Sequence, residues 1–268
     1  MNLRKSLGIL LVVFVAGLAL SRVTDAPVFS AASNKEKIPV LMYHKVSPYY
    51  YHGGPGLRIT PDFFEEQVRY LKERGYHTVS LDQLIDFWDK KAALPSKPIV
   101  LTFDDGYEDN YRFVFPILKK YGYTATIFLV YNDIGGYNAW DSKNNLVQRI
   151  RLLSWVEIRA MQKSGISFQS HTLNHPDLTA LNPIDAEKEV RESKAKLEKA
   201  LGKPVCFIAY PYGRRNPVVD DVVAKAGYKA ALTTIMGKNT IGTDRFILRR
   251  LRVNGYLNMN RFKKMVEE

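Results

Sequence analysis

The chain has 268 residues, of which 46% are hydrophobic and 25% are charged. These fractions are ordinary for a folded protein, and they exclude a mainly disordered or collagen-like chain. Lys and Arg outnumber Asp and Glu by 39 to 27, which gives a formal net charge of +12 at pH 7. This excess favours polyanionic surroundings, either a nucleic acid or an anionic cell wall or membrane surface.

The first residues have the pattern of an export signal. Arg4 and Lys5 precede an apolar run over residues 6–20, and small residues follow at 30–32. The run is shorter than the roughly 20 apolar residues of a membrane-spanning helix, so cleavage near Ala32 is favoured over retention as an anchor. We therefore expect a secreted or cell-surface protein that meets an anionic cell wall or membrane surface and has no nucleic-acid partner.

Downstream of residue 32, short apolar runs alternate with amphipathic stretches, which is typical of βα units around a parallel sheet. The predicted strands are residues 40–43, 77–80, 99–103, 124–130, 166–170, 205–210, 229–233 and 247–253. Eight strands of this kind indicate a single α/β domain with a barrel.

Helix starts are predicted from capping patterns between these strands. One helix follows Thr60, which stands before a proline and an acid, and another follows Ser154 in a capping-box pattern. The longest begins after Asn182 and ends at Gly202.

Residues 49–56 and 132–145 are predicted as long loops, which often border binding sites in compact domains. The single cysteine, Cys206, excludes an internal disulfide and is interpreted as a packing residue.

Polar side chains follow three of the predicted strands. His44 follows the first, Asp104 and Asp105 follow the strand at 99–103, and His171 and His175 follow the strand at 166–170. Because the loops at the carboxyl ends of barrel strands converge on one face, these side chains are expected to meet there.

Each pair has an ordinary interpretation when it is taken alone. An aspartate before a glycine often caps a turn, and two histidines four residues apart are weak evidence for a metal. Together, however, they offer two imidazoles and a carboxylate, a common zinc ligand set that leaves a position open for water. The combination therefore indicates a metal site.

Two motifs resemble a known family. Residues 102–106, TFDDG, and residues 171–176, HTLNHP, are similar to the signature motifs of NodB-like polysaccharide deacetylases, which form carbohydrate esterase family 4. The resemblance implies a distorted (β/α) barrel, with residues 97–268 as the catalytic region and residues 33–96 as the N-terminal part of the barrel.

The resemblance also implies roles for individual residues. Asp104 matches the general base, while Asp105, His171 and His175 match the ligands of a divalent metal. Zn²⁺ is the first expectation, and the same ligands suit Co²⁺, Ni²⁺ or Fe²⁺.

A third motif of the family corresponds to residues 209–213, AYPYG, where the backbone N–H of Tyr212 would bind the oxyanion formed from the substrate. Two departures stand out. Ala209 occupies the place of an arginine that supports the base, and the strand at 247–253 is not followed by the usual histidine acid. His44 is the candidate substitute acid or substrate-binding group; equally, it could orient an aspartate or a metal ligand.

Residues 39–46, PVLMYHKV, resemble the branch of the family that includes poly-β-1,6-N-acetylglucosamine deacetylases. The expected function is therefore metal-dependent removal of N-acetyl groups from an N-acetylglucosamine polysaccharide at the cell surface, by a monomer. The alternatives are a peptidoglycan or chitooligosaccharide deacetylase, and a catalytically weak barrel that binds cell-wall glycan.

Overall fold

The computed structural model describes residues 36–50, 54–140 and 149–268. The predicted export signal and parts of both predicted loops lie outside these ranges. Among the described residues, no helix is both long enough and apolar enough to cross a bilayer.

Eight parallel strands form the main sheet, and each predicted strand segment overlaps one of them. Seven close into a ring in the order β1, β10, β9, β8, β7, β6, β5, because β1 pairs with both β10 and β5. The strands are β1 (Val40–Tyr43), β4 (His77–Thr78), β5 (Pro98–Phe103), β6 (Thr126–Leu129), β7 (Ser167–Ser170), β8 (Phe207–Ala209), β9 (Ala230–Met236) and β10 (Leu248–Arg252). The predicted barrel is thus confirmed.

The ring has seven strands, although eight were predicted, because β4 lies outside it. β4 pairs only with the start of β5, and from Val100 onward the neighbour of β5 is β1. A separate parallel pair, β2 (Lys45–Val46) and β3 (Arg58–Ile59), follows β1 in the chain.

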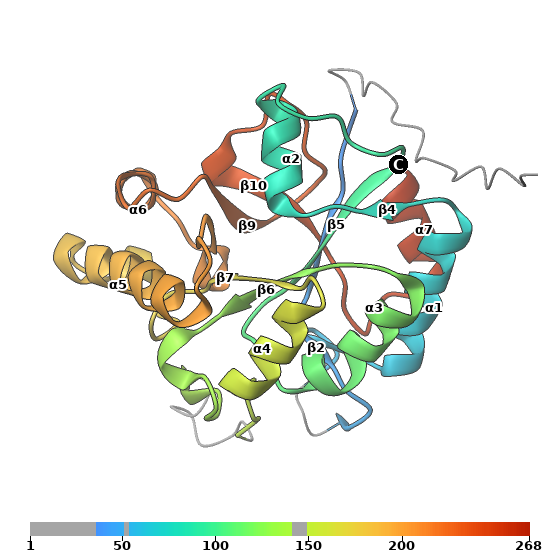
Figure 1. Cartoon of the computed structure of the whole chain (residues 1–268), viewed down its shortest axis with the longest axis horizontal. Helices are drawn as coiled ribbons and strands as arrows, with labels where there is room; N and C mark the ends of the chain where they lie inside the picture. Colours follow the sequence, from blue (N-terminus) through green and yellow to red (C-terminus); the bar gives the residue numbers. More distant parts are fainter. Residues whose placement is uncertain (1–35, 51–53, 141–148) are drawn as a thin grey trace, which may run out of the picture.

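Helices surround the ring of strands (Figure 1). They are α1 (Pro61–Glu73), α2 (Leu81–Trp88), α3 (Phe115–Tyr121), α4 (Trp155–Lys163), α5 (Pro183–Leu201), α6 (Pro217–Lys225) and α7 (Met259–Glu267). The capping predictions are confirmed: Thr60, Ser154 and Asn182 each accept a hydrogen bond from the first turn of their helix, and Gly202 ends α5 in the left-handed conformation.

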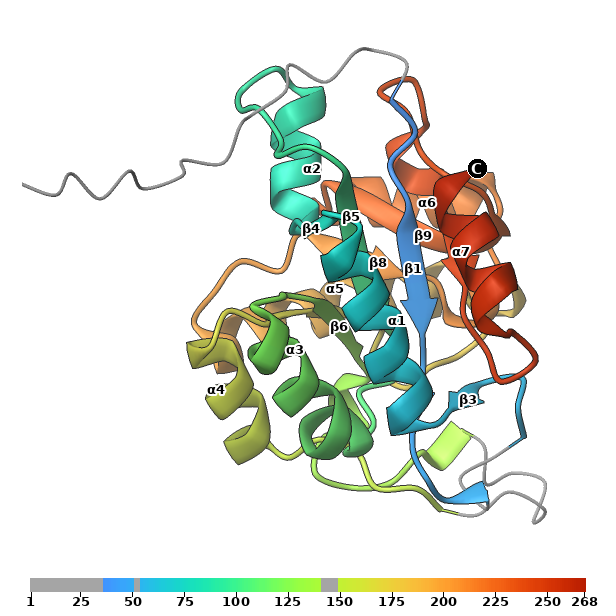
Figure 2. The ribbon, with the colours of Figure 1, turned by 90° about the vertical axis from the view of Figure 1, so that its right-hand side faces the viewer.

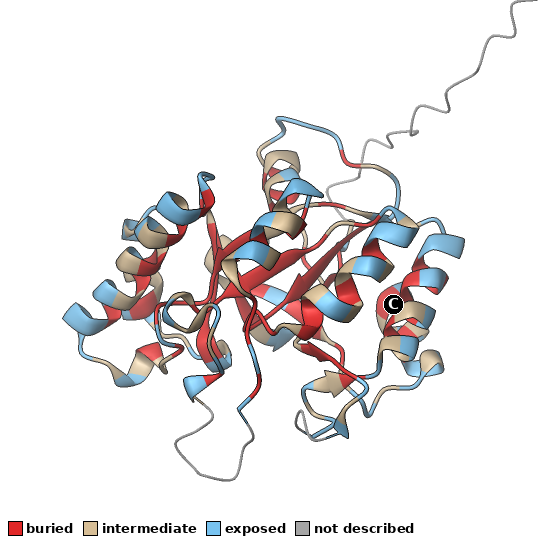
Figure 3. Ribbon diagram, turned by 60° about the horizontal axis from the view of Figure 1, so that its bottom comes forward, coloured by how far each residue is buried: buried red, intermediate tan, exposed pale blue. Residues whose placement is uncertain are grey.

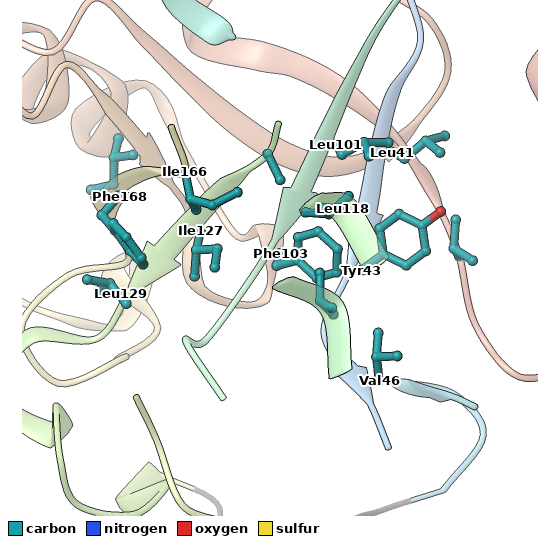
Figure 4. Close-up of a cluster of buried hydrophobic side chains, with 14 of the residues drawn as sticks. Leu41, Tyr43, Val46, Leu101, Phe103, Leu118, Ile127, Leu129, Ile166 and Phe168 are labelled. Atoms are coloured by element: carbon teal, nitrogen blue, oxygen red, sulfur yellow. The ribbon is translucent and has the colours of Figure 1, made fainter. Parts of the chain in front are cut away.

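Two apolar layers hold the barrel together, one outside the strands and one inside. In the outer layer, alternate strand residues such as Tyr43 and Phe103 meet the surrounding helices, and their rings stack at 5.0 Å (Figure 4). The inner layer joins the opposite faces of the strands to α2, whose Leu84 and Trp88 are buried. Burial is correspondingly concentrated in the strands and the inward faces of the helices (Figure 3).

α2 lies at the end of the barrel where the strands begin (Figure 2). That end is therefore covered by apolar side chains, and the carboxyl ends of the strands remain for a functional site.

Candidate active site

The side chains that follow β1, β5 and β7 meet at the carboxyl end of the barrel. His44, Asp104, Asp105, His171 and His175 all line one cavity of ≈ 210 Å³, here called the metal cavity. The expectation that the strand ends would bring them together is therefore met by the geometry.

Asp104 is held by an arginine that the sequence did not single out. Arg250 of β10 is fully buried, and its Nη1 and Nη2 donate to the two carboxylate oxygens of Asp104 at 2.7 and 2.8 Å. The same guanidinium donates from Nε to the carbonyl oxygen of Thr233. Two parallel hydrogen bonds fix both the position and the orientation of the carboxylate.

The pKa of Asp104 reflects this pairing. Burial acts to raise it, but the charge of Arg250, together with His171 and His44, outweighs burial and places the pKa below its ordinary value. Asp104 is therefore ionised at neutral pH and can accept a proton.

Asp105, His171 and His175 form a compact ligand set. The Nε2 atoms of the two histidines lie 3.3 and 3.4 Å from Oδ1 of Asp105, and one ligand atom from each residue falls within 4.8 Å of the others. All three residues are buried. Two imidazoles and a carboxylate that converge in this way fit a divalent cation such as zinc.

The tautomer of one ligand is fixed by the backbone. Nδ1 of His171 lies 2.8 Å from the carbonyl oxygen of Ala209, so it carries a proton, and Nε2 is the nitrogen left to face Asp105 and a metal. Metal-bound histidines commonly make such a second hydrogen bond. Ala209, which stands where the third motif usually has an arginine, thus helps to orient His171 through its backbone carbonyl group.

The loop that carries the two histidines is held from α5. Glu189 accepts hydrogen bonds from the backbone N–H groups of Leu173 and Asn174 and from the side chain of Asn174. The N–H of His175 in turn donates to the hydroxyl of Thr172.

Backbone strain is concentrated at the site. Within the described ranges, six non-glycine residues have positive φ, and four of them, Asp105, Thr172, His175 and Tyr212, lie at or beside the metal cavity. Such conformations cost of order 1–3 kcal/mol each and persist where the surrounding structure enforces them. The next residue, Gly106, also has positive φ, and a glycine is favoured there because a Cβ would lie 2.7 Å from the side chain of Leu129.

His44 stands beside Asp104, with 3.8 Å between its Nε2 and the Oδ2 of Asp104. Its carbonyl oxygen accepts a hydrogen bond from Asn110, which also donates to Asp109. Burial lowers the pKa of His44 below its ordinary value, although Asp104 and Asp105 act in the opposite direction. His44 therefore lies in the site beside the carboxylate of Asp104, but beyond direct hydrogen-bond distance from it.

Aromatic rings enclose His175 on two sides. Trp140 stacks on it with 4.7 Å between the ring centroids, and Tyr212 meets it edge-on at the same distance. Tyr212 has φ 59°, and a Cβ on the following Gly213 would collide with Thr234. The backbone at Tyr212 is consequently fixed beside the ligand set.

Comparison with known proteins agrees with this geometry. Residues 91–231 match the family model described as polysaccharide deacetylase. The chain is 31% identical over 245 residues to the polysaccharide deacetylase-like protein YxkH of Bacillus subtilis. The aligned region is 91% of this chain and 81% of YxkH. The chain belongs to the polysaccharide deacetylase family.

Other members of the family extend the likeness. Poly-beta-1,6-N-acetyl-D-glucosamine N-deacetylase of Staphylococcus aureus is 30% identical over 178 residues, which are 62% of this chain and 57% of that protein. The deacetylase PplD of Streptococcus pyogenes superposes with a TM-score of 0.75 at 30% identity, covering 87% of this chain and 99% of that one. IcaB of Ammonifex degensii gives 0.72 at 26% identity, with 86% and 95% covered.

Arg250 is the residue that reasoning from the sequence missed. The arginine that is absent at Ala209 is supplied by β10, the same strand that lacks the family's usual histidine. A signal for it exists: Arg250 alternates with Leu248 in a barrel strand, so its side chain falls on a buried face. A charge at such a position needs a partner, and the nearest strand ends carry acids.

Proposed function

We propose that this polysaccharide deacetylase removes N-acetyl groups from an N-acetylglucosamine polysaccharide at the cell surface and depends on a divalent metal. The observation that carries the proposal is the Asp104 carboxylate, held by Arg250 beside the cluster of Asp105, His171 and His175. Zn²⁺ is the first expectation for the metal, and Co²⁺, Ni²⁺ or Fe²⁺ suit the same ligands.

In this proposal each residue has a defined task. A metal held by Asp105, His171 and His175 supplies Lewis acidity for the acetamide carbonyl and for water. Asp104 accepts the proton of the attacking water, and its orientation is set by Arg250.

Two further groups act on the oxyanion and on the leaving amine. The backbone N–H of Tyr212 stabilises the oxyanion. His44 donates a proton to the leaving amine, which is a poor leaving group until it is protonated.

The polysaccharide is assigned by the likeness to poly-beta-1,6-N-acetyl-D-glucosamine N-deacetylase of Staphylococcus aureus. The cell-surface location rests on the export pattern of residues 1–32. A barrel that only binds glycan was suggested by the missing arginine and acid together with the basic charge, and Arg250 removes the first of these reasons by supplying an arginine to the base.

The test is acetate release by the purified chain from β-1,6-linked and β-1,4-linked N-acetylglucosamine oligomers, assayed in parallel. Release from the β-1,6 series is expected; a chelator should stop it, and added Zn²⁺ should restore it. Asp105→Ala should be inactive, whereas Asp86→Asn, at the opposite end of the barrel on α2, should not. Faster release from the β-1,4 oligomers would reassign the substrate to a β-1,4-linked glycan, and tight binding without any release would make the chain a glycan-binding barrel.

A further inference from the structure

A second cavity adjoins the metal cavity. It has a volume of ≈ 580 Å³, and it shares three lining residues, Trp140, His175 and Tyr212, with the metal cavity. These three side chains therefore form the wall between the two spaces. The larger space, which Asp133 and Asn174 also line, is here called the outer cavity.

The outer cavity lies in a row with its neighbours. A third cavity of ≈ 370 Å³ shares Asn174, Pro176 and Leu181 with it, and none of these three lines the metal cavity. The outer cavity thus has the metal cavity on one side and the third cavity on another. A row of adjacent hollows suits a linear polymer better than a single small molecule.

The volumes indicate which part of a polymer each cavity takes. Small-molecule sites usually occupy about 300–1,000 Å³. The metal cavity, at ≈ 210 Å³, is below this range and suits the reacting acetamide group and part of its sugar. The outer cavity, at ≈ 580 Å³, lies within the range and has room for the neighbouring sugar unit.

The outer cavity combines aromatic and polar walls. The rings of Trp140 and Tyr212 stand against His175 at its inner end. A sugar ring has apolar C–H faces and a polar edge, so it can lie against such rings while its hydroxyl groups reach polar side chains.

Asp133 brings a carboxylate to the outer cavity, and the charged group that acts on it is His175 in the inner wall. The other acid in its wall, Asp177, is paired with Arg214. The carboxylate of Asp133 is partly buried and has no hydrogen bond or ion pair with any residue in the described ranges.

The backbone around Asp133 is fixed. The preceding residues Tyr131 and Asn132 donate hydrogen bonds to the carbonyl oxygens of Thr172 and Leu173, in the loop that carries the histidines. The charge is therefore held at a set place beside His175. In a protein with a formal net charge of +12, a carboxylate without an ion pair in a cavity offers a matching site for a cationic group of the ligand.

We propose that the outer cavity is a subsite for a glucosamine unit that has already lost its acetyl group, with Asp133 as the partner of its ammonium group. The inference rests on the proposed function, because it assumes that the polymer being deacetylated lies along the row of cavities. An N-acetylated neighbour is neutral, whereas a deacetylated one is cationic at neutral pH, so Asp133 distinguishes the two. Deacetylation is then favoured beside units that have already reacted.

The kinetic test compares the fully acetylated disaccharide with its two mono-deacetylated isomers, in the linkage that the chain hydrolyses fastest. For the isomer whose free amine falls in the outer cavity, kcat/KM should exceed that of the fully acetylated disaccharide by about tenfold, the effect of one hydrogen bond between charged groups. Asp133→Asn should remove most of this preference and leave hydrolysis of the acetylated disaccharide nearly unchanged. Asp86→Asn, which removes the same charge at the opposite end of the barrel, should keep the preference.

Three results would overturn the assignment. Equal rates on all three disaccharides in the unaltered chain would show that the cavity does not select an amine. A preference that survives Asp133→Asn would place the selecting group elsewhere. A uniform loss of rate in Asp133→Asn, accompanied by loss of bound metal, would make Asp133 an orienting partner of His175.

A binding measurement separates this inference from the proposed function. Fully deacetylated glucosamine trisaccharide, added to the chain and followed by calorimetry, should bind about tenfold more weakly to Asp133→Asn than to the unaltered chain or to Asp86→Asn. Failure to deacetylate any oligomer would contradict the proposed function alone, whereas equal binding by all three proteins would contradict the subsite.

Discussion

Arg250 and Asp104 form a fully buried, bidentate ion pair between β10 and the loop after β5. Removing one partner of such a pair leaves an uncompensated charge in the barrel interior, which typically costs about 3–5 kcal/mol.

Arg250→Met should therefore lower the free energy of unfolding by about 3–5 kcal/mol and slow deacetylation by on the order of 100-fold, because the base is no longer oriented or kept ionised. Arg250→Lys should recover part of the stability and little of the rate, since an ammonium group cannot make two parallel hydrogen bonds. Denaturant unfolding and initial rates measure the two effects. The double variant Arg250→Met with Asp104→Asn should be more stable than Arg250→Met alone, and equal stability of the two would argue against the pair.

Asp105→Ala, His171→Ala and His175→Ala should each abolish metal retention, because a three-ligand site loses its chelate geometry when one ligand is removed. Metal content after dialysis, measured on the folded proteins, is the readout. His77→Ala is the matched control, since this histidine is exposed and its ring hydrogen-bonds to the backbone of Ser96, away from the metal cavity. One metal per chain in all three variants would refute the assigned ligand set.

Asp104→Asn should keep the metal but lose most of the hydrolysis, on the order of 100-fold or more, because an amide cannot accept the proton of water. Metal analysis and acetate release on the same preparation test this. The variant also leaves Arg250 without its charged partner, so its stability should be lower. Turnover near that of the unaltered chain with the metal bound would place the base elsewhere.

His44→Ala should slow deacetylation by ~100-fold while leaving the metal content unchanged, if His44 protonates the leaving amine. The pH profile of kcat/KM gives a second readout, because a required imidazolium makes the rate fall as pH rises through its pKa. That limb should disappear in His44→Ala. If the limb remains, Asp104 returns the proton that it took from water, and an unchanged rate would reduce His44 to a neighbour that orients the site.

Asp109→Asn tests a buried acid that is linked to the backbone of His44 through Asn110, whose side chain donates to both. Burial raises the pKa of Asp109 to about 7 from an ordinary value of 3.8. The folded protein therefore holds a proton that the unfolded chain releases above about pH 4, and stability from this group falls as pH rises, until both states are ionised above about pH 7. The variant has no such loss, so at pH 8 it should be more stable by roughly 1–4 kcal/mol, with little difference near pH 4. Urea unfolding at the two pH values decides the matter, and parallel curves for both proteins would contradict the raised pKa.

Local signals explain why so much of the fold was predictable. The ends of α1, α4 and α5 depend on side chains within four residues, such as the Ser154 cap, and these patterns are visible in the sequence. His44, Asp104 and His171 were found by the same logic, since each directly follows an apolar strand.

Non-local pairing explains what was missed. The position of β4 outside the ring depends on β5 exchanging its partner at Val100, and no property of either segment alone reveals this. Arg250 meets Asp104 only because β10 and β5 lie on either side of β1. The position of Asp133 in a cavity next to the metal cavity could not be predicted either, because Trp140 and Tyr212, which separate the two cavities, come from distant parts of the chain.

The place of Arg250 in the chain has a consequence for biosynthesis. β10 is the last strand of the barrel, and Arg250 emerges 146 residues after the aspartate that it neutralises. A nascent chain that has not yet reached β10 lacks this guanidinium, so its proton acceptor is neither oriented nor charge-balanced. Competence for hydrolysis is thereby tied to the synthesis of β10, so a chain interrupted or clipped before Arg250 is expected to be inactive.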